Sequence, residues 1–392
     1  MHIYILIFWV SFFIVFYTYI GYGILLFFLV KIKECFVNEK RTESILHYPE
    51  VTLLIAAYNE EEVIFLKMSN SEELNYPQDK LKIVWVTDGS TDSTNNLLEK
   101  YGNVNVLFQP ERMGKTAAIN RAVQFIDSPI IVFTDANTIL NVSAVTEIVK
   151  AFENPHVGCV AGEKRVLSKD KDKAAAGGEG FYWKYESYLK SLDSRLHSAV
   201  GAAGELFAIR RELFEEIAPD TLLDDFMISM KIAAKGYKIE YCRDAYAQES
   251  GSLTMVDEKK RKVRIAAGGI QSIYRLSFLL NIFKYSIFSF QYISHRVLRW
   301  TLTPILLFAL IPINIVIVLY SELTVFYYLL GLQLVFYIMA LLGKVIEDKK
   351  IKIKLFFIPY YFIFMNFNVI NGFIYLIRKK KGDGTWEKSQ RN

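Results

Sequence analysis

The stretch LKIVWVTDGSTD, residues 81–92, decides the fold class of this chain. Its first six residues, Leu81 to Val86, form a short apolar run that is typical of a strand buried on both faces of a sheet. The carboxylate of Asp88 follows the run, and residues 90–92 offer side-chain caps for a helix. A strand that leads through a carboxylate into a helix is the repeating unit of a parallel α/β sheet.

The same pattern recurs between residues 51 and 137. Further apolar runs predict strands over Val51 to Ala57, Val104 to Phe108 and Pro129 to Phe133. Helices are expected over residues 95–101 and 115–125. Because strands that alternate with helices pair in parallel through right-handed crossovers, we expect an α/β fold with a mostly parallel sheet. The carboxyl ends of such strands share one edge of the sheet, where ligands bind.

Polar side chains gather at this predicted edge. They are Tyr58 and Glu60, Asp88, Lys115, and Asp135 with Asn137. The oxygens of Asp135 and Asn137, two positions apart on an extended turn, suit Mg²⁺ or Mn²⁺ held jointly with phosphates. Such a metal would neutralise charge developing on a diphosphate leaving group. The simpler alternatives are a helix cap for Asp88, a polar strand end for Asp135 and a surface position for Lys115.

Two adjacent aspartates, Asp224 and Asp225, stand in the less regular segment between residues 150 and 250. A helix is predicted from Phe226 to Lys235, ending at Gly236, which is in the right place for a C-terminal cap. If both aspartates are buried, repulsion from Asp224 raises the pKa of Asp225 toward neutral, as a general base requires. Asp224 is also expected to act as the helix N-cap.

The N-terminus predicts a membrane anchor. Residues 3–30 carry no charge and are long enough to span a bilayer. A secretory signal peptide is the alternative. The apolar run is too long for one, and neither Lys nor Arg precedes it.

The C-terminal part predicts further membrane segments. Residues 301–320 and 324–343 have the length of spans, whereas 276–293 carries Lys284 and suits a helix in the membrane interface. A fourth apolar stretch, 355–377, contains one proline and three asparagines, and we expect it to be interfacial or re-entrant, which keeps the C-terminal tail inside.

Composition agrees with a membrane enzyme. The 392 residues are 52% hydrophobic, and the formal net charge is only +5. The basic residues flank the apolar segments, which is the positive-inside signature rather than a nucleic-acid footprint. It places residues 31–300 on the cytoplasmic side of the cell's inner (plasma) membrane. The three cysteines are scattered, which argues against a disulfide framework.

These observations divide the chain into six expected parts. They are an N-terminal transmembrane helix (1–30), a linker (31–50), a cytoplasmic catalytic domain (51–258), interfacial helices (259–299), a C-terminal membrane region (300–377) and a basic tail (378–392).

Seven motifs in this order resemble the membrane-integrated family 2 glycosyltransferases, which have a GT-A catalytic domain. That group includes cellulose, chitin, hyaluronan and poly-N-acetylglucosamine synthases. The resemblance runs from Val51 to about Gly269 and includes the flanking spans. The motifs start at Ala57, Val86, Gly114, Thr134, Gly201, Asp224 and Arg261.

The resemblance implies a role for each matching residue. Tyr58, Glu60 and Asp88 would contact the uridine of a UDP-sugar, and Lys115 would reach its diphosphate. Asp135 and Asn137 would hold the metal-bound diphosphate. Asp225 would deprotonate the acceptor, a glycan or a lipid-linked molecule, and Arg264 would steady the leaving group. Membrane lipids are further expected partners, and nucleic acid is not.

Two departures from the family pattern matter. The family's second metal-binding acid is Asn137 here, which keeps an oxygen ligand and loses a charge. Processive members carry a Gln and a stacking Trp beside the arginine, and Ile265 replaces that Trp. Trp386 in the tail, or the aromatic helix from Phe181 to Tyr188 with its Trp183, offers a substitute platform.

Three interpretations follow. The leading one is transfer of a sugar to a growing cell-surface polysaccharide. The second is addition of a single sugar to a lipid, which the missing Gln and Trp favour. The third is a catalytically silent scaffold, against which the intact aspartates and Arg264 argue. A nicotinamide-dependent oxidoreductase is disfavoured, because no G-x-G-x-x-G follows the first strand.

Overall fold

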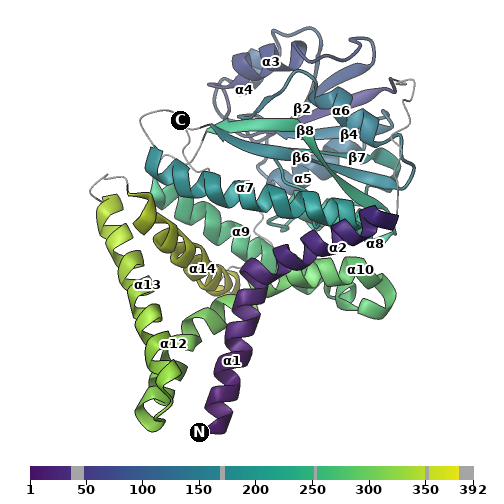
Figure 1. Ribbon diagram of the computed structural model, residues 1–392. Helices are drawn as coiled ribbons and strands as arrows, with labels where there is room; N and C mark the ends of the chain where they lie inside the picture. The colour runs from purple at the N-terminus through teal and green to yellow at the C-terminus, as the bar shows by residue number, and fades with distance from the viewer. Residues whose placement is uncertain (37–47, 168–172, 251–253, 349–352, 379–392) are drawn as a thin grey trace.

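The computed structural model describes residues 1–36, 48–167, 173–250, 254–348 and 353–378. Within them lies an eight-stranded sheet in the order β3-β2-β1-β4-β7-β6-β8-β5 (Figure 1). The strands are β1 (Val51–Ala57), β2 (Leu81–Asp88), β3 (Val104–Gln109), β4 (Ile130–Asp135), β5 (Ile139–Leu140), β6 (Val157–Leu167), β7 (Leu206–Arg210) and β8 (Lys238–Ser250).

The four strands β1 to β4 pair in parallel and confirm the predicted half of the sheet. Asp88 and Asp135 are the last residues of β2 and β4, in each case two positions later than the predicted strand end. In the strand register, Ala57 of β1 lies opposite Thr87 and Ala56 lies opposite Asp135. The two carboxylates therefore lie at one edge of the sheet.

The second half of the sheet was not predicted. The strand β7 is antiparallel to both β4 and β6, and β8 runs parallel to β6 along most of its length. Charged residues interrupt the apolar pattern of β6. Lys164 is buried there between Glu205 and Glu249, with which it forms ion pairs. This internal charge network hides the strand from a search for apolar runs.

Helices cover both faces of the sheet. Alternate residues of β1 belong to different apolar clusters, with Leu54 in one and Leu53 and Ile55 in the other. The second cluster receives α3 (Ile64–Glu72), α4 (Thr94–Leu98) and α6 (Ala144–Ala151). The helices α5 (Lys115–Val123) and α8 (Asp224–Ala234) pack against the first cluster, which also contains residues between 276 and 300. Two predicted helices, 95–101 and 115–125, end earlier than expected.

The N-terminal helix is bent. It consists of α1 (His2–Phe16), a π-helical turn η1 (Tyr17–Gly21) and α2 (Tyr22–Phe36). While α1 packs against α12 (Leu302–Tyr320), α2 turns away to lie along α7 (Lys173–Leu196), as Figure 1 shows. The predicted boundary between helix and linker at residue 31 is too early, because the helix continues to Phe36.

A buried polar cluster fixes α2 to α7, to α10 (Ile282–Tyr292) and to the π-helical turn η4 (Ile293–Val297). The hydroxyl of Tyr22 donates to Asp193 at 2.5 Å, and Gln291 donates to the same carboxylate at 3.0 Å. His295 contacts Asp193 through Nδ1 and Glu186 through Nε2. These interactions join segments that lie more than 90 residues apart in the sequence.

The remaining elements connect the sheet to the apolar helices. They are the 3₁₀ turn η2 (Arg211–Leu213), α9 (Met255–Arg275), η3 (Ser277–Leu280), α10 (Ile282–Tyr292), η4 (Ile293–Val297), α11 (Leu298–Trp300), α12 (Leu302–Tyr320), α13 (Thr324–Asp348) and α14 (Lys354–Arg378). The helix α9 begins four residues before the predicted boundary at 259. In Figure 1, α7 and α9 both run between the sheet and the apolar helices.

Four helices in the described residues are long and apolar enough to cross a membrane. They are His2–Phe36, Leu302–Tyr320, Thr324–Glu347 and Leu355–Arg378. The stretch 355–377, which we expected to be interfacial or re-entrant, lies in one continuous helix, α14, despite Pro359. Its interfacial placement stays a prediction. It approaches α9 closely at Gly372, where a Cβ atom would lie 2.6 Å from Cβ of Ala266. The predicted tail lies outside the described residues from residue 379 onward.

Candidate functional site

The loops that follow β1 and β2 are tied together. Asn59 adopts a positive φ of 53°, and its Oδ1 accepts a hydrogen bond from the backbone N–H of Thr91 at 2.8 Å. The backbone N–H of Glu60 donates to Oγ1 of Thr94 at 2.9 Å. These bonds place Tyr58 and Glu60 at the same edge of the sheet as Asp88.

Asp88 anchors the loop that leads into α5. Its buried carboxylate accepts hydrogen bonds from the backbone N–H groups of Met113, at 3.0 Å, and Gly114, at 2.6 Å. Gly114 has a φ of 94°, which a residue with a side chain rarely adopts, and it directly precedes Lys115. Asp88 therefore positions Lys115. The alternative that it caps the following helix is wrong, because Asp92 accepts the hydrogen bond from Thr94 there.

Lys115 joins the end of β4 to the start of α8. Its Nζ lies 2.7 Å from Oδ1 of Asp135 and 3.8 Å from Oδ2 of Asp224. Burial opposes the ammonium charge, but Asp135 and Asp224 outweigh it and raise the pKa of Lys115 above its ordinary value. The lysine is thus a fixed cation at the edge of the sheet, and the alternative of an ordinary surface lysine is wrong.

The adjacent aspartates begin α8. Leu223 is the N-cap residue, which corrects the expectation that Asp224 caps this helix. Oδ1 of Asp225 accepts a hydrogen bond from the backbone N–H of Phe226 at 2.8 Å. Burial, and then repulsion from Asp224, raise the pKa of Asp225 to about 7. The predicted direction is confirmed, although burial is a larger cause than the neighbouring charge.

Gly204 keeps the space beside these residues open. A Cβ atom at this position would lie 3.4 Å from Nζ of Lys115 and 3.5 Å from Oδ2 of Asp225. Gly201, at the other end of the same segment, has a φ of 86° and packs against the ring of Phe226. The segment 201–204 therefore brings the backbone close to the start of α8.

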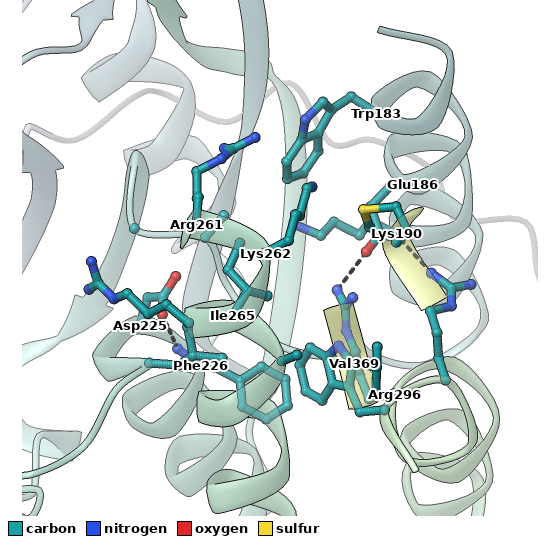
Figure 2. A pocket seen from close by; sticks show the side chains of 18 of the residues that line it. Trp183, Glu186, Lys190, Asp225, Phe226, Arg261, Lys262, Ile265, Arg296 and Val369 are labelled. Carbon is teal, nitrogen blue, oxygen red and sulfur yellow. Dashed lines mark hydrogen bonds and ion pairs between the residues drawn. The ribbon is translucent and has the colours of Figure 1, made fainter. Parts of the chain in front are cut away.

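A cavity of ≈ 520 Å³ opens at this edge of the sheet and extends to the apolar helices (Figure 2). Of the nine predicted site residues, five line it: Lys115, Asp135, Asp224, Asp225 and Arg264. Tyr58, Glu60, Asp88 and Asn137 are not part of its wall. The first three lie on the neighbouring strand-end loops, and Asn137 follows β4 on the turn after Asp135.

The residues fit a metal that is shared with a ligand. In the described part of the chain, no three His, Cys, Asp or Glu side chains cluster closely enough to hold a metal ion. Asp135, whose side chain is 26% exposed, and Asn137 supply two oxygen donors on one turn. Because Mg²⁺ is held in proteins by one or two carboxylates plus phosphates and water, this small donor set suits a phosphate-bound ion.

The helix α9 supplies another wall of the cavity through Arg261, Lys262, Arg264 and Ile265. Trp183 of α7 also lines it, and Lys262 lies 5.6 Å from the centre of its ring. An aromatic residue is therefore present in the same cavity as Ile265. Trp386, the other predicted platform, lies outside the described residues.

Sequence reasoning missed several cavity residues. Glu205, Glu186, Lys190, Arg296, Arg299 and Trp300 all line it. Arg296 and Arg299 hold Glu186 with N–O distances of 2.7 and 2.9 Å. The sequence gives no local signal for this cluster, because charged residues at these spacings are ordinary on amphipathic helices. Only the packing of α7 against η4 and α11 brings them together.

Comparison with known proteins identifies the domain that holds this site. Residues 52–218 match the glycosyl transferase family 2. The chain carries a family 2 glycosyl transferase domain. Asp88, Lys115, Asp135 and Glu205 lie within the matched residues. The aspartate pair that begins α8, and all of α9, lie beyond its end.

Two groups of relatives share part of the sequence. Poly-beta-1,6-N-acetyl-D-glucosamine synthase of Staphylococcus aureus is 26% identical over 265 residues, which cover 64% of this chain and 62% of the relative. Beta-monoglucosyldiacylglycerol synthase of Nostoc sp. is 27% identical over 239 residues, which cover 57% of this chain and 49% of the relative. The chain thus spans less than two thirds of the length of either relative.

A solved structure shares the fold of the family 2 domain and its helices. A mannosyltransferase from Pyrobaculum calidifontis, in complex with GDP-Man and Mn²⁺, superposes with a TM-score of 0.71. The match covers 96% of this chain and 100% of that one, at 21% sequence identity. The fold is therefore a GT-A domain with a mostly parallel sheet, accompanied by apolar helices, as predicted.

Proposed function

We propose that this protein is a membrane-bound inverting glycosyltransferase. It transfers a sugar from a UDP-sugar to a growing cell-surface polysaccharide, at the cytoplasmic face of the plasma membrane. The observation that carries the proposal is the position of Asp225. This carboxylate, with a pKa raised to about 7, shares one cavity with the Lys115–Asp135 pair and with the apolar helices.

The side chains divide the chemistry between them. Asp225 accepts the proton of the acceptor hydroxyl while the oxygen of that hydroxyl forms a bond to the anomeric carbon of the donor sugar. The bond from that carbon to the diphosphate breaks at the same time, and UDP leaves with the electron pair. Lys115 and Arg264 offer positive charge to the diphosphate. Inversion follows from a single in-line displacement, for which one base is sufficient.

Asp135 and Asn137 would hold a divalent cation, Mg²⁺ or Mn²⁺, at the diphosphate. When bound, the cation would neutralise the negative charge that develops on the diphosphate leaving group. Tyr58, Glu60 and Asp88 would contact the uridine from the carboxyl edge of the sheet, where ligands bind in α/β folds. The carboxylate of Asp88 also fixes the loop before Lys115.

Addition of a single sugar to a lipid is the second candidate function. The cavity favours it through its apolar lining, which includes Tyr19 and Ile20 of η1 and Phe362 and Met365 of α14. These residues belong to helices that are long and apolar enough to cross a membrane. An acceptor with an acyl or prenyl chain fits such a wall.

The proposed function is tested with the full-length protein in nanodiscs. The protein is incubated with each of a panel of UDP-sugars, with GDP-mannose as a comparison donor, and the products are sized. Polymer from one UDP-sugar supports the leading proposal, and a single glycosylated lipid supports the second. Turnover of GDP-mannose alone would overturn the assignment of the donor.

A further inference from the structure

A fully buried lysine of α3, Lys67, contacts the turn that follows β4. Its Nζ donates to Oγ1 of Thr134 at 3.0 Å, to the carbonyl oxygen of Thr138 at 2.8 Å and to Oγ1 of Thr138 at 3.4 Å. These two threonines flank the residues that carry the candidate metal ligands, Asp135 and Asn137. One amine thus holds both ends of the segment 134–138.

Lys67 approaches this segment from the face that is turned away from the cavity. Successive side chains of a strand point to opposite faces, and Thr134 and Asp135 are neighbours in β4. Of the residues that the structure describes, those lining the cavity include Asp135 but neither Thr134 nor Lys67. Lys67 therefore acts on the turn without reaching a ligand in the cavity.

Packing alone gives no reason for a lysine at this position. The neighbouring α3 residues Ile64 and Met68 are buried, apolar members of the cluster on this face of the sheet. Burying an amine removes it from water, and an apolar side chain of similar volume would pack here without that cost. The hydrogen bonds to the turn are what distinguish a lysine from a methionine at this place.

The hydrogen bonds from Lys67 leave the threonine hydroxyls available for other partners. Each hydroxyl has a single hydrogen to donate. Because Nζ donates to both oxygens, Thr138 can donate its hydrogen to the carbonyl of Asp135 at 2.9 Å, and Thr134 can donate to the carbonyl of Glu205 at 3.0 Å. The network therefore joins the turn to Glu205, which lines the cavity.

This network does not depend on the charge of the lysine. Burial lowers the pKa of Lys67 to about 7, and the charge of Asp135 opposes the shift. Even the neutral amine keeps two hydrogens. These are sufficient for the two shorter bonds, to Thr134 and to the carbonyl of Thr138.

We propose that Lys67 is a positioning residue for the metal-bound diphosphate. By fixing both ends of the segment 134–138, it holds the side chains of Asp135 and Asn137 in the arrangement that a cation shared with phosphates requires. Groups behind the ligands of a metal commonly orient those ligands. This inference rests on the proposed function, because the cation belongs to it.

The test is a calorimetric titration of UDP, with and without Mn²⁺, into the full-length protein in detergent. Lys67→Met nearly keeps the volume of the side chain and removes its hydrogen bonds. We expect Mn²⁺-dependent UDP binding to weaken by about tenfold, the lower range for loss of a group that orients metal ligands. UDP binding without metal should stay at the wild-type value, since the loops after β1 and β2 are unchanged.

The sign of the effect distinguishes positioning from simple electrostatics. Removal of a positive charge close to a bound cation would by itself tighten Mn²⁺ binding. Weaker binding in Lys67→Met therefore reports the loss of the hydrogen bonds to the turn.

Asn70→Leu is the matched control from the same helix. The Asn70 side chain donates to the carbonyl of Leu140 and accepts from its N–H, both at 2.8 Å, so it ties α3 to β5 beyond the turn. We expect wild-type Mn²⁺-dependent UDP affinity in this variant. Equal losses in Asn70→Leu and Lys67→Met would show that any loosening of α3 is sufficient, which overturns the specific role of Lys67.

A double-mutant cycle with Thr134→Val tests whether Lys67 acts through the threonine. Each single variant should weaken Mn²⁺-dependent UDP binding. The double variant should lose less than the product of the two single effects, because both substitutions break one network. Single effects that multiply fully would show that Lys67 does not act through Thr134.

The outcomes separate this inference from the proposed function. Mn²⁺-dependent binding that is equal or tighter in Lys67→Met overturns the inference alone. Equal UDP affinity with and without Mn²⁺ in the wild type contradicts the proposed cation, and the inference with it. If thermal unfolding shows that Lys67→Met is not folded, Thr134→Val takes its place in the test. Wild-type Mn²⁺-dependent affinity in that variant would then overturn the inference.

Discussion

Nζ of Lys115 and Oδ1 of Asp135 lie 2.7 Å apart, so the cation that follows β3 and the carboxylate that ends β4 form one ion pair. A metal-bound diphosphate would compete for both partners. Its phosphates attract the ammonium, and its cation attracts the carboxylate. We therefore expect the pair to hold the two groups in place before the donor binds and to open as the donor enters.

Removal of the general base should stop transfer without affecting donor binding. In Asp225→Asn the side chain keeps its size and loses its ability to accept a proton. The rate should fall by at least about 10²-fold, the lower range for general base catalysis. UDP affinity, measured by calorimetry, should stay near the wild-type value. Retained turnover in this variant would remove Asp225 from the role.

The rate of the wild type should fall as the pH drops below about 7, because the carboxyl of Asp225 is then protonated. Lys115→Met should move this acidic limb to higher pH, since the charge of Lys115 lowers the pKa of Asp225. Lys115→Arg, which keeps the charge, is the matched control. The measurement is the pH profile of kcat/KM for the wild type and the two variants. An acidic limb at the same pH in Lys115→Met as in the wild type would show that the charge of Lys115 does not affect the pKa of Asp225.

Metal binding should depend on the turn after β4. Asp135→Ala is expected to weaken the binding of Mn²⁺ and of UDP together, because the cation bridges protein and diphosphate. Asn137→Asp adds a second carboxylate and should tighten Mn²⁺ binding. Calorimetric titrations of UDP with and without Mn²⁺ provide the measurement. Equal UDP affinity in both conditions would count against a metal at this turn.

Product length should depend on the aromatic lining of the cavity. Ile265 has no aromatic ring that could stack on a sugar, so we expect a short or modest product and a longer one from Ile265→Trp. Trp183 lines the same cavity as Ile265, and we expect it to be the substitute platform. Trp183→Ala should therefore shorten the product further.

Sizing the products of these variants and of Trp386→Ala identifies the platform. Long polymer from the wild type that survives all three changes would show that the acceptor is held elsewhere. In that case, the interpretation of Ile265 as a lost platform is wrong.

Gly201→Ala should destabilise the domain. The residue has a φ of 86°, and an added Cβ would lie 2.2 Å from the ring of Phe226. We expect a loss of about 2 kcal/mol or more in the free energy of unfolding, from backbone strain and overpacking together. Gly236→Ala is the control, since its φ of 93° is similar but no atom lies within 4 Å of the added Cβ. Equal losses in the two variants, measured by thermal unfolding, would show that contact with Phe226 contributes nothing.

The strands that the sequence predicts are mostly those in which nearly every residue is apolar and buried. Strands β1, β2 and β4 are largely buried on both faces, so their sequences are nearly continuous apolar runs. Strand β3, at the edge of the sheet, is only partly buried. The ends of all four strands were located to within two residues. Strand β6 carries Lys164 inside the domain, where Glu205 and Glu249 make its burial possible. Both glutamates lie far from it in the sequence, so no local pattern reveals the strand.

The residues that line the cavity also differ in how far the sequence alone reveals them. Lys115, Asp135 and Asp225 follow strands or begin a helix, where polar residues stand out from their neighbours. Lys190 and Glu186 lie within a long helix that carries many charges, and nothing in α7 alone marks them. Their significance arises from contact with η4 and α11, more than 100 residues later in the chain.

The cluster around Asp193 determines when, during synthesis of the chain, the sheet and the apolar helices can come together. Tyr22 leaves the ribosome 171 residues before the carboxylate that it contacts, and His295 emerges 102 residues after that carboxylate. The junction between the sheet and the apolar helices can therefore close only after the ribosome has passed residue 295. A fragment cut to residues 51–258 would lack Tyr22, Gln291, His295, Arg296 and Arg299. It would expose the carboxylates of Glu186 and Asp193 without their partners, so the intact chain is the natural unit for expression.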